Sequence, residues 1–351
     1  MKTSRFIWGL LLPLLFVSCS SERDEEVVFE KAKVVSSFPK EITLSLSDAQ
    51  DVDLGILGIA DLYSHDSMLM VVTRSDEPVI ELFDYETLEP KGGFLRHGNG
   101  PNEVQPFAFP YSSSSRFVNK GDSLYLDFRN GMKNYLRWNL TAAYNGQGEF
   151  VKEVQYNFAP AALYRWILND STVLCKTLVD NNTRVVREVL VNGTDRTPGF
   201  LSELDKAKVQ TENDGFVFNT LGTLVEYNPE LDVVAEVSLH LDVINLYSLH
   251  SNYHESIQIG KKPVLISDIE ALMKSGIYDC SHVKETVSSE SSFSLLYRDS
   301  AGDMSILQFG WDGKPLSRIS LPENVSSLDI HGKDIWTVSA GSEQVRRYTL
   351  Q

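Results

Sequence analysis

The residues with the chemistry to catalyse a reaction or bind a metal are few and scattered along this chain. His250 and His254 have the i, i+4 spacing that places two metal ligands on one face of a helix. The surrounding LYSLHSNYHESIQIG is typical of a strand end and a loop, and no Glu stands between the histidines as the zinc-protease motif requires. We therefore interpret both as solvated loop histidines, and the sequence predicts no metal site.

Other catalytic patterns do not occur either. The chain has no Gly-x-Ser-x-Gly nucleophile motif and no calcium loop of alternating Asp followed by Gly. HGNGPNE (97–103) lacks the Gly-Lys-Ser/Thr ending of a phosphate loop and is not followed by a helix, so it is better read as a structural turn. In that turn Glu103 could accept hydrogen bonds from backbone amides. We predict no catalytic residue and no cofactor, although loops of a larger fold can assemble a site that spacing does not reveal.

Composition and charge narrow the class of protein. Of the 351 residues, 42% are hydrophobic and 23% are charged, as in soluble globular proteins, and the net charge is −16. Affinity for nucleic acid comes from concentrated Lys and Arg, so the acidic excess argues against a nucleic-acid partner. The charge suits an exported protein that stays soluble by self-repulsion.

The N-terminus has the features of a targeting signal. Lys2 and Arg5 form a short positive region, and the apolar segment Phe6–Val17 follows. This segment is too short to span a bilayer core of roughly 30 Å, and Pro13 interrupts it. The sequence therefore predicts a signal peptide and not a transmembrane helix.

The residues around Cys19 suggest a lipid anchor. FVSC resembles a bacterial lipobox, in which the Cys becomes the first residue and carries lipid, although Phe16 stands where the family usually has Leu. The resemblance implies a signal peptide over 1–18, lipidation of Cys19 and a polar, acidic tether over 19–30. The alternative is an ordinary signal peptide with an incidental Cys. The acidic run SSERDEEVV also resembles a surface-export signal of some Gram-negative lipoproteins, which favours the outer membrane and its surface face over the periplasmic face.

One short signature, Asp-Ser followed by apolar residues, recurs at Asp66, Asp122, Asp170 and Asp299. In the first three places it precedes a β-branched or aromatic run typical of a strand, and about a dozen residues later a second strand is expected. Asp and Ser suit such a junction because their short side chains bond nearby backbone groups. At Asp299 the pair instead falls in the turn between the two predicted strands.

These strand pairs form six repeats. Their second strands begin at intervals of about 40 to 62 residues, at Val79, Tyr135, Arg184, Val243, Ser305 and Val345. Repeats averaging about 53 residues predict an all-β, six-bladed β-propeller over 31–351. The last repeat lacks a fourth strand, which we expect the N-terminal segment 27–46 to supply, closing the ring. One inserted helix is predicted over Leu265–Gly276. A β-sandwich or a pair of smaller β-domains is the alternative.

Several segments match a known family. RHGNGPNEVQPF (Arg96–Phe107) is similar to the Gly-x-Gly-Pro-x-Glu connection after the first blade of the TolB-like six-bladed propellers of exported bacterial lipoproteins. Gly98, Gly100, Pro101 and Glu103 occupy the matching positions. ILQFGWDGKPLSRISL and the closing DIWTVSAGSEQVRRYTL also resemble that family's final blade. The resemblance implies a fold and a location, and it implies no activity.

Two modifications are expected from local sequence. Asp-Ser-apolar resembles an O-glycosylation motif that some Gram-negative anaerobes use on exported proteins, which makes Ser67, Ser123, Ser171 and Ser300 candidate acceptors. This reading is compatible with a hairpin turn, because glycans attach where a turn is exposed. An exported compartment also permits a disulfide between Cys175 and Cys280, but Cys175 lies in an apolar strand where a buried thiol is equally consistent with the sequence.

These features lead to a hypothesis of function. We expect a membrane-anchored, non-enzymatic propeller that binds an envelope protein, a small molecule or a glycan. The alternative is an exported hydrolase or lyase acting on glycan or peptide, which predicts a pocket lined by metal ligands or carboxylates at the mouth of the central funnel. Glycan capture would need aromatic side chains exposed on one rim. We expect core positions instead for Trp138, Trp166, Trp311 and Trp336.

Overall fold

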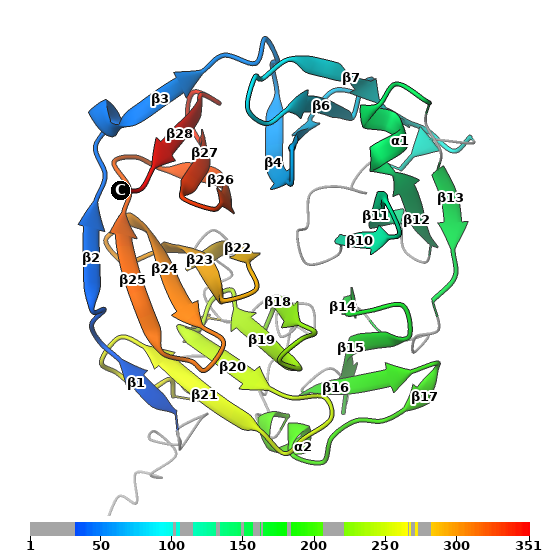
Figure 1. Ribbon diagram of the computed structural model, residues 1–351. Coiled ribbons are helices and arrows are strands. Elements are labelled where there is room, and N and C mark those ends of the chain that lie inside the picture. Colours follow the sequence, from blue (N-terminus) through cyan, green and yellow to red (C-terminus); the bar gives the residue numbers. More distant parts are fainter. Residues whose placement is uncertain are drawn as a thin grey trace, which may run out of the picture.

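The computed structural model describes residues 32–100, 103–105, 115–130, 134–148, 151–156, 162, 164–180, 184–205, 221–265, 267, 271–272 and 282–351. Within these ranges the chain is mostly β-strand, and six sheets stand in a ring around a common centre (Figure 1). The predicted six-bladed β-propeller is confirmed.

The first three blades are four-stranded antiparallel sheets whose strands follow one another from the centre to the rim (Figure 1). Their strands are, in blade 1, β4 (Ile59–His65), β5 (Met68–Thr73), β6 (Ile80–Asp84) and β7 (Pro90–Phe94); in blade 2, β10 (Arg116–Lys120), β11 (Ser123–Asn130), β12 (Asn134–Asn139) and β13 (Val151–Val154); and in blade 3, β14 (Tyr164–Ile167), β15 (Thr172–Val179), β16 (Arg184–Val191) and β17 (Thr194–Asp195). A short parallel pair, β8 (Arg96–His97) and β9 (Glu103–Val104), follows blade 1.

The other three blades repeat this plan. Their strands are, in blade 4, β18 (Thr223–Asn228), β19 (Val233–Ser238), β20 (Val243–Tyr247) and β21 (His254–Ile259); in blade 5, β22 (Val283–Ser288), β23 (Ser292–Arg298), β24 (Met304–Gly310) and β25 (Pro315–Ser320); and in blade 6, β26 (Val325–His331), β27 (Asp334–Ser339) and β28 (Val345–Thr349). Blade 6 thus takes only three strands from its own repeat, as predicted.

The N-terminal segment runs along the rim of blades 4, 5 and 6 (Figure 1). β1 (Lys33–Val35) and β2 (Lys40–Thr43) add parallel fifth strands to blades 4 and 5 by pairing with β21 and β25. After the 3-10 turn η1 (Leu46–Asp48), β3 (Ala49–Val52) pairs antiparallel with β28 and completes blade 6. An N-terminal strand therefore closes the ring, but it lies just after the segment 27–46 that we expected to supply it.

Two further differences concern helices. β12 ends at Asn139, because the Asn139 side chain accepts a 2.9 Å hydrogen bond from the Ala142 N–H and caps the short helix α1 (Leu140–Tyr144), which the sequence did not predict. A second short helix, α2 (Leu201–Leu204), follows β17. Most of the helix predicted over Leu265–Gly276 lies outside the described residues.

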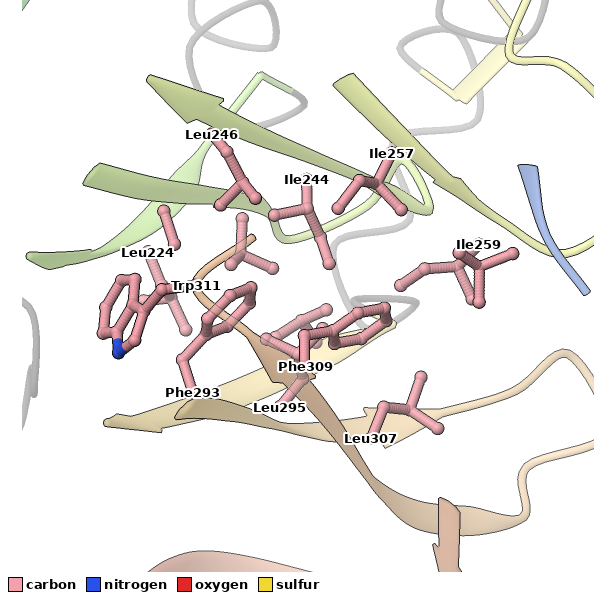
Figure 2. Close-up of a cluster of buried hydrophobic side chains, with 14 of the residues drawn as sticks. Leu224, Ile244, Leu246, Ile257, Ile259, Phe293, Leu295, Leu307, Phe309 and Trp311 are labelled. Atoms are coloured by element: carbon pink, nitrogen blue, oxygen red, sulfur yellow. The ribbon is translucent and has the colours of Figure 1, made fainter. Parts of the chain in front are cut away.

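Apolar clusters between neighbouring blades hold the ring together. Figure 2 shows the cluster between blades 4 and 5, where Phe293, Phe309 and Trp311 face Leu246, Ile257 and other aliphatic side chains. Two middle strands, β5 and β20, are nearly continuous apolar runs because neighbouring blades cover both of their faces, and every residue of each is buried. Each fully buried Leu, Ile or Phe stabilises the fold by roughly 1.5–3 kcal/mol relative to an exposed position.

The four tryptophans expected in the core, Trp138, Trp166, Trp311 and Trp336, are all buried.

Candidate functional site

A cavity of about 310 Å³ lies at the centre of the ring, where the first strands of all six blades meet. Each of these strands supplies part of the wall. The side chains that line it are Tyr63, Ser64 and His65 of β4, Arg116 and Phe117 of β10, Trp166 and Ile167 of β14, Val225, Glu226 and Tyr227 of β18, Thr286, Val287 and Ser288 of β22, and Asp329 and Ile330 of β26, together with Met70, Ser115, Leu126 and Leu168. The closed ring, and no single blade, makes this site.

The first strands are packed more tightly on one side of the cavity than on the other. β18 lies against β22, β22 against β26, and β26 against β4, so blades 4, 5, 6 and 1 form a continuous inner wall. Acidic side chains on these four strands accept hydrogen bonds from a neighbouring blade. We call this side the acidic wall and define it by Asp61, Glu226, Glu285 and Asp329.

Glu226 joins blades 4 and 5 within the acidic wall. Its Oε1 accepts a 2.7 Å hydrogen bond from the Thr286 hydroxyl, and its Oε2 accepts one of 2.6 Å from the Ser288 hydroxyl. Burial raises the pKa of Glu226 against the opposing effect of these two donors. The carboxyl group is therefore held in a fixed position on the cavity surface.

Asp61 and Glu285 lie close together behind that surface. The Tyr63 hydroxyl donates to Asp61 Oδ2 at 2.5 Å, and the Leu328 N–H donates to Glu285 Oε2 at 2.5 Å. Burial raises the pKa of both carboxyl groups, and the charge of Asp61 raises that of Glu285 further, well above its ordinary value. Such a pair holds a proton at pH values where an exposed carboxyl would be ionised.

Asp329 links blade 6 to blade 1. Its Oδ2 accepts a 2.8 Å hydrogen bond from the Ser64 N–H and a second one from the Ser64 hydroxyl. Burial raises the pKa of Asp329 to about 7, with a smaller contribution from the charge of Asp61. This carboxyl group therefore changes its charge near neutral pH.

A shared irregularity directs two of these acids and a serine that contacts one of them. β4, β22 and β26 each carry a β-bulge near their start, between Ile59 and Asp61, between Val283 and Glu285, and between Val325 and Ser327. A bulge changes the direction of the side chains that follow it. Asp61, Glu285 and Ser327 occupy the equivalent position after the bulge, and the Ser327 hydroxyl donates to Asp61.

The opposite side of the cavity carries basic groups that are already paired. Arg116 contacts Asp170 at 2.7 Å and Asp127 at 3.2 Å, and Lys120 contacts Asp170 at 2.9 Å. Arg137 binds both oxygens of Asp127, at 2.5 and 2.6 Å. Arg116, Lys120 and Arg137 therefore each have an acidic partner within blades 2 and 3.

Aromatic rings line the cavity between these two sides. The rings of Tyr63 and Phe117 lie 6.5 Å apart, and those of His65 and Phe117 lie 5.0 Å apart. Tyr227 and Trp166 contribute two more rings to the wall. The cavity thus combines acidic groups, hydroxyl groups and aromatic faces. Among the described residues, no group of three or more His, Cys, Asp or Glu is arranged to hold a metal ion.

The residues singled out in the sequence lie elsewhere. His250 follows β20 with its Nδ1 2.9 Å from Asp232 Oδ1, and His254 begins β21 with its ring stacked on Phe200. Both histidines are exposed, and their rings contact different partners.

The Gly98–Glu103 loop is held by its own acidic residue. Glu103 Oε2 accepts a 2.5 Å hydrogen bond from the Gly100 N–H, and Glu103 Oε1 lies 2.7 Å from Arg96. A Cβ on Gly98 would meet Glu103 Oε2 at 2.0 Å, so the folded-back carboxylate occupies the space that a side chain would need. Pro101 is outside the described residues.

The Asp-Ser pairs occupy turns, as expected. Asp66–Ser67 connects β4 to β5, Asp122 immediately precedes Ser123 at the start of β11, and Ser171 immediately precedes β15. Ser300 lies between β23 and β24, a second-to-third strand turn, so it is at the opposite end of its blade from the other three. Ser67 and Ser300 are exposed, whereas Ser123 and Ser171 are half-buried. Glycosylation of any of them stays a prediction.

Two cysteine predictions concern residues that are not described. Cys19 and Cys280 both lie outside the described ranges. Cys175 is fully buried in β15 and packs in a cluster with Tyr135, Ile167 and Val173. Lipidation of Cys19 and a bridge between Cys175 and Cys280 stay predictions.

The acidic wall was not identified from the sequence. Its signal is an acidic residue in a short strand that precedes an apolar strand, as in IADLYSH (59–65), VKETVS (283–288) and VSSLDIH (325–331). Each of these is the first strand of its blade, whereas the sequence signals of the repeats lie in the strands that follow. A search for acidic residues at matching positions in the first strands would have found them.

Comparison with known proteins supports the fold and leaves the family open. No family model matches the chain, and no curated protein matches it. A solved structure of a protein described as exported, from Bacteroides fragilis, is 9% identical, with a TM-score of 0.52 over 91% of this chain and 99% of that one. A DUF4221 family member from Bacteroides vulgatus is 12% identical, with a TM-score of 0.48 over 86% and 95%.

Raptor from Chaetomium thermophilum is 11% identical, with a TM-score of 0.43, and matches 94% of this chain but only 29% of its own length. At such identities a likeness shows the fold alone. The propeller rests on the arrangement of the six sheets and on the likeness to the Bacteroides fragilis protein, and membership of the TolB-like family stays a prediction.

Proposed function

We propose that this chain is an exported, lipid-anchored binding protein that holds a small ligand in the cavity at the centre of its propeller. One observation carries this proposal: the first strands of all six blades converge on a cavity of about 310 Å³ that combines carboxyl, hydroxyl and aromatic groups. Ligand sites typically occupy roughly 300–1,000 Å³ and combine apolar walls with a few fixed polar groups. A small ligand therefore suits this site better than a protein surface does.

The ligand site can be tested directly with the full chain, purified from membranes in neutral detergent. A library of small polar compounds is screened for those that raise the melting temperature, and the hits are located by crystallography. We expect at least one hit to lie in the central cavity. Hits confined to the outer surface, or no stabilising compound at all, would contradict the proposal.

Export and lipid anchoring are supported by the N-terminal sequence. The positive residues, the apolar segment and Cys19 occur in the order of a lipoprotein signal. No helix in the described part of the chain is long and apolar enough to cross a membrane. In cells fed an alkyne analogue of palmitate, the wild-type protein should incorporate the analogue and the Cys19→Ala variant should not. The variant should also be absent from the membrane fraction. Surface display predicts that protease added to intact cells degrades the protein.

The alternative to a small ligand is a protein partner in the cell envelope. Cross-linking of intact cells followed by purification would capture such a protein in near-stoichiometric yield. That result would make this propeller an accessory subunit, with the cavity in a secondary role. We expect no stoichiometric protein partner.

A hydrolase or lyase acting on glycan or peptide is the second candidate function. The observation that favours it is that two carboxyl groups, those of Glu226 and Asp329, line one cavity, because paired carboxyls serve as acid and base in such enzymes. This reading predicts turnover of a glycan or peptide that Glu226→Gln and Asp329→Asn each abolish. Binding without turnover supports the binding protein.

A further inference from the structure

Most buried carboxylates of the described residues have a basic partner. Four such pairs occur in blades 2, 3, 4 and 6. They are Asp127 with Arg137 at 2.5 Å, Asp205 with Arg187 at 2.5 Å, Glu236 with Lys176 at 2.9 Å, and Asp334 with Arg347 at 2.5 Å. In each of these four pairs, an Arg or Lys neutralises the charge of a buried acid.

The exceptions gather around the central cavity. Asp61, Glu285 and Asp329 are at least nine-tenths buried, and none of them forms an ion pair within the described part of the chain. Glu226, on the cavity surface, has hydroxyl partners and likewise no ion pair there. Among the described residues, the buried acids without an ion pair are thus Asp61, Glu285 and Asp329, and the half-buried Glu226 lines the same cavity as Asp329.

Groups of the protein only partly compensate these four acids. A buried carboxylate is costly unless it is paired, and hydroxyl and amide donors supply less stabilisation than an opposite charge does. Asp329 and Glu226 both line the cavity, so a bound molecule can contact them. A positive charge in the cavity would supply the missing partner.

Arg116, the one arginine among the described residues that line the cavity, does not fill this role. Arg116 is engaged by Asp127 and Asp170 on the opposite side. The aromatic rings of Tyr63, Phe117 and Tyr227 add electron-rich faces, which attract cations within about 6 Å of a ring centre. The charge of the acidic wall and the rings therefore favour the same kind of ligand.

We propose that the ligand of the central cavity is a small organic cation, an amine or ammonium compound whose charged nitrogen binds beside Glu226 and Asp329. This inference rests on the proposed function, because it takes the cavity to be the ligand site. It goes further by naming the chemical class of the ligand and the residues that select it.

The test compares charged compounds with neutral compounds of the same shape. The full chain in neutral detergent is titrated calorimetrically with benzylamine, agmatine, spermidine and choline, and with the matching compounds in which hydroxyl or methyl groups replace the charged nitrogens. We expect at least one cation to bind ten-fold or more tightly than its neutral counterpart. If no cation of the panel binds more tightly than its counterpart, the inference is overturned.

Variants assign the selectivity to the acidic wall. Glu226→Gln keeps the size and the hydrogen-bonding capacity of the side chain and removes its charge, so it should weaken the cation at least ten-fold and leave the neutral counterpart unchanged. Glu230→Gln is the matched control, because Glu230 is exposed in the turn after the same strand. Asp329→Asn is a second variant, and the melting temperature of each shows that it folds. Equal cation affinity in the wild type and Glu226→Gln would refute the assignment.

The outcomes separate this inference from the proposed function. A neutral compound that binds in the cavity, with no preference for cations, keeps the binding function and refutes the ligand class. Failure of every compound in this panel and in the wider screen refutes both.

Discussion

The backbone N–H of Ser64 donates a 2.8 Å hydrogen bond to Oδ2 of Asp329, 265 residues further along the chain. Ser64 belongs to the first strand of blade 1, and Asp329 to the first strand of blade 6. The contact therefore closes the ring on its inner side, beside the cavity. On the rim, the pairing of β3 with β28 closes the same ring. Ring closure and the acidic wall thus share one carboxyl group.

The first prediction concerns the pH dependence of Asp329. Burial raises its pKa in the folded protein to about 7, from an ordinary value of 3.8. Between these pH values the folded state holds a proton that the unfolded state has lost, so stability is greatest below about pH 4 and falls as the pH rises to 7. Asp329→Asn cannot lose that proton. Relative to the wild type, this variant should gain up to about 4 kcal/mol in free energy of unfolding between pH 4 and pH 8.

Urea unfolding of both proteins at pH 5 and pH 8 measures this difference. Asp61 and Glu285 also have raised pKa values through burial, so the wild-type slope alone combines several groups. The difference between the wild type and the variant isolates the contribution that Asp329 makes. The same difference at both pH values would show that Asp329 is ionised throughout.

The second prediction concerns the rim closure. A chain that starts at residue 45 loses β1 and β2, the added fifth strands, and should stay folded with a lower melting temperature. A chain that starts at residue 54 also loses β3. This truncation exposes the edge of β28 and removes the buried side chain of Val52. Burial of Val52 alone stabilises the fold by roughly 1.5–3 kcal/mol. We expect the shorter chain to aggregate or unfold, as circular dichroism and gel filtration would show.

A chain that starts at residue 32 is the reference for both truncations. Equal melting temperatures for the chains starting at residues 45 and 54 would mean that β3 does not close the ring.

The propeller could be predicted because its signals are local and repeated. Apolar runs mark the second and third strands of the repeats, Asp-Ser turns mark four of the six, and a missing fourth strand in the last repeat predicts an N-terminal closure. The strand that makes this closure was predicted too early in the chain, over 27–46 instead of Ala49–Val52. Alternation over 27–46 is equally typical of a fifth strand at the rim, and β1 and β2 take that role, whereas AQDV of β3 has little strand character. Pairing with the exposed edge of β28 determines its structure.

The cavity could not be predicted in the same way. Asp61 and Asp329 are 268 positions apart in the sequence, and no spacing rule brings them together. Their meeting depends on ring closure and on the bulges of β4 and β26, which depend on contacts across the strands. The motifs with familiar chemistry, His250/His254 and the Gly98–Glu103 loop, are local in the sequence and do not line the cavity.

The third prediction concerns that loop. Gly98→Ala places a methyl group where Glu103 Oε2 lies, so the carboxylate must leave Gly100 and Arg96. We expect the melting temperature to fall by a few degrees. Gly199→Ala is the control, because a Cβ there meets no atom within 4 Å. In a Glu103→Ala background the clash is gone, and the further effect of Gly98→Ala should be smaller. An undiminished effect would place the cause in the backbone of the loop.

The last prediction concerns the buried ion network between blades 3 and 4. Lys176 is 1% exposed, and its Nζ donates to Glu236 at 2.9 Å, to Thr223 at 3.0 Å and to the Leu221 carbonyl at 3.1 Å. Arg187 binds both oxygens of the same Glu236, at 2.7 and 2.8 Å. Burial lowers the pKa of Lys176 to about 8, and the charge of Glu236 opposes this effect. The lysine is therefore charged at pH 7 and balances one of the two acids of the network.

Lys176→Met removes that charge and leaves Glu236 and Asp205 with a single cation, Arg187. Loss of one partner of a buried ion pair costs roughly 3–5 kcal/mol, so urea unfolding at pH 7 should show a loss of this size. The double variant Lys176→Met/Glu236→Gln restores the balance of charge, with Arg187 paired to Asp205. It should therefore be less destabilised than the sum of the two single variants. Lys314→Met, which breaks the exposed contact with Asp312, should leave the unfolding curve unchanged. Additive single effects would mean that Lys176 and Glu236 stabilise the two blades independently, and that packing, not charge balance, holds this interface together.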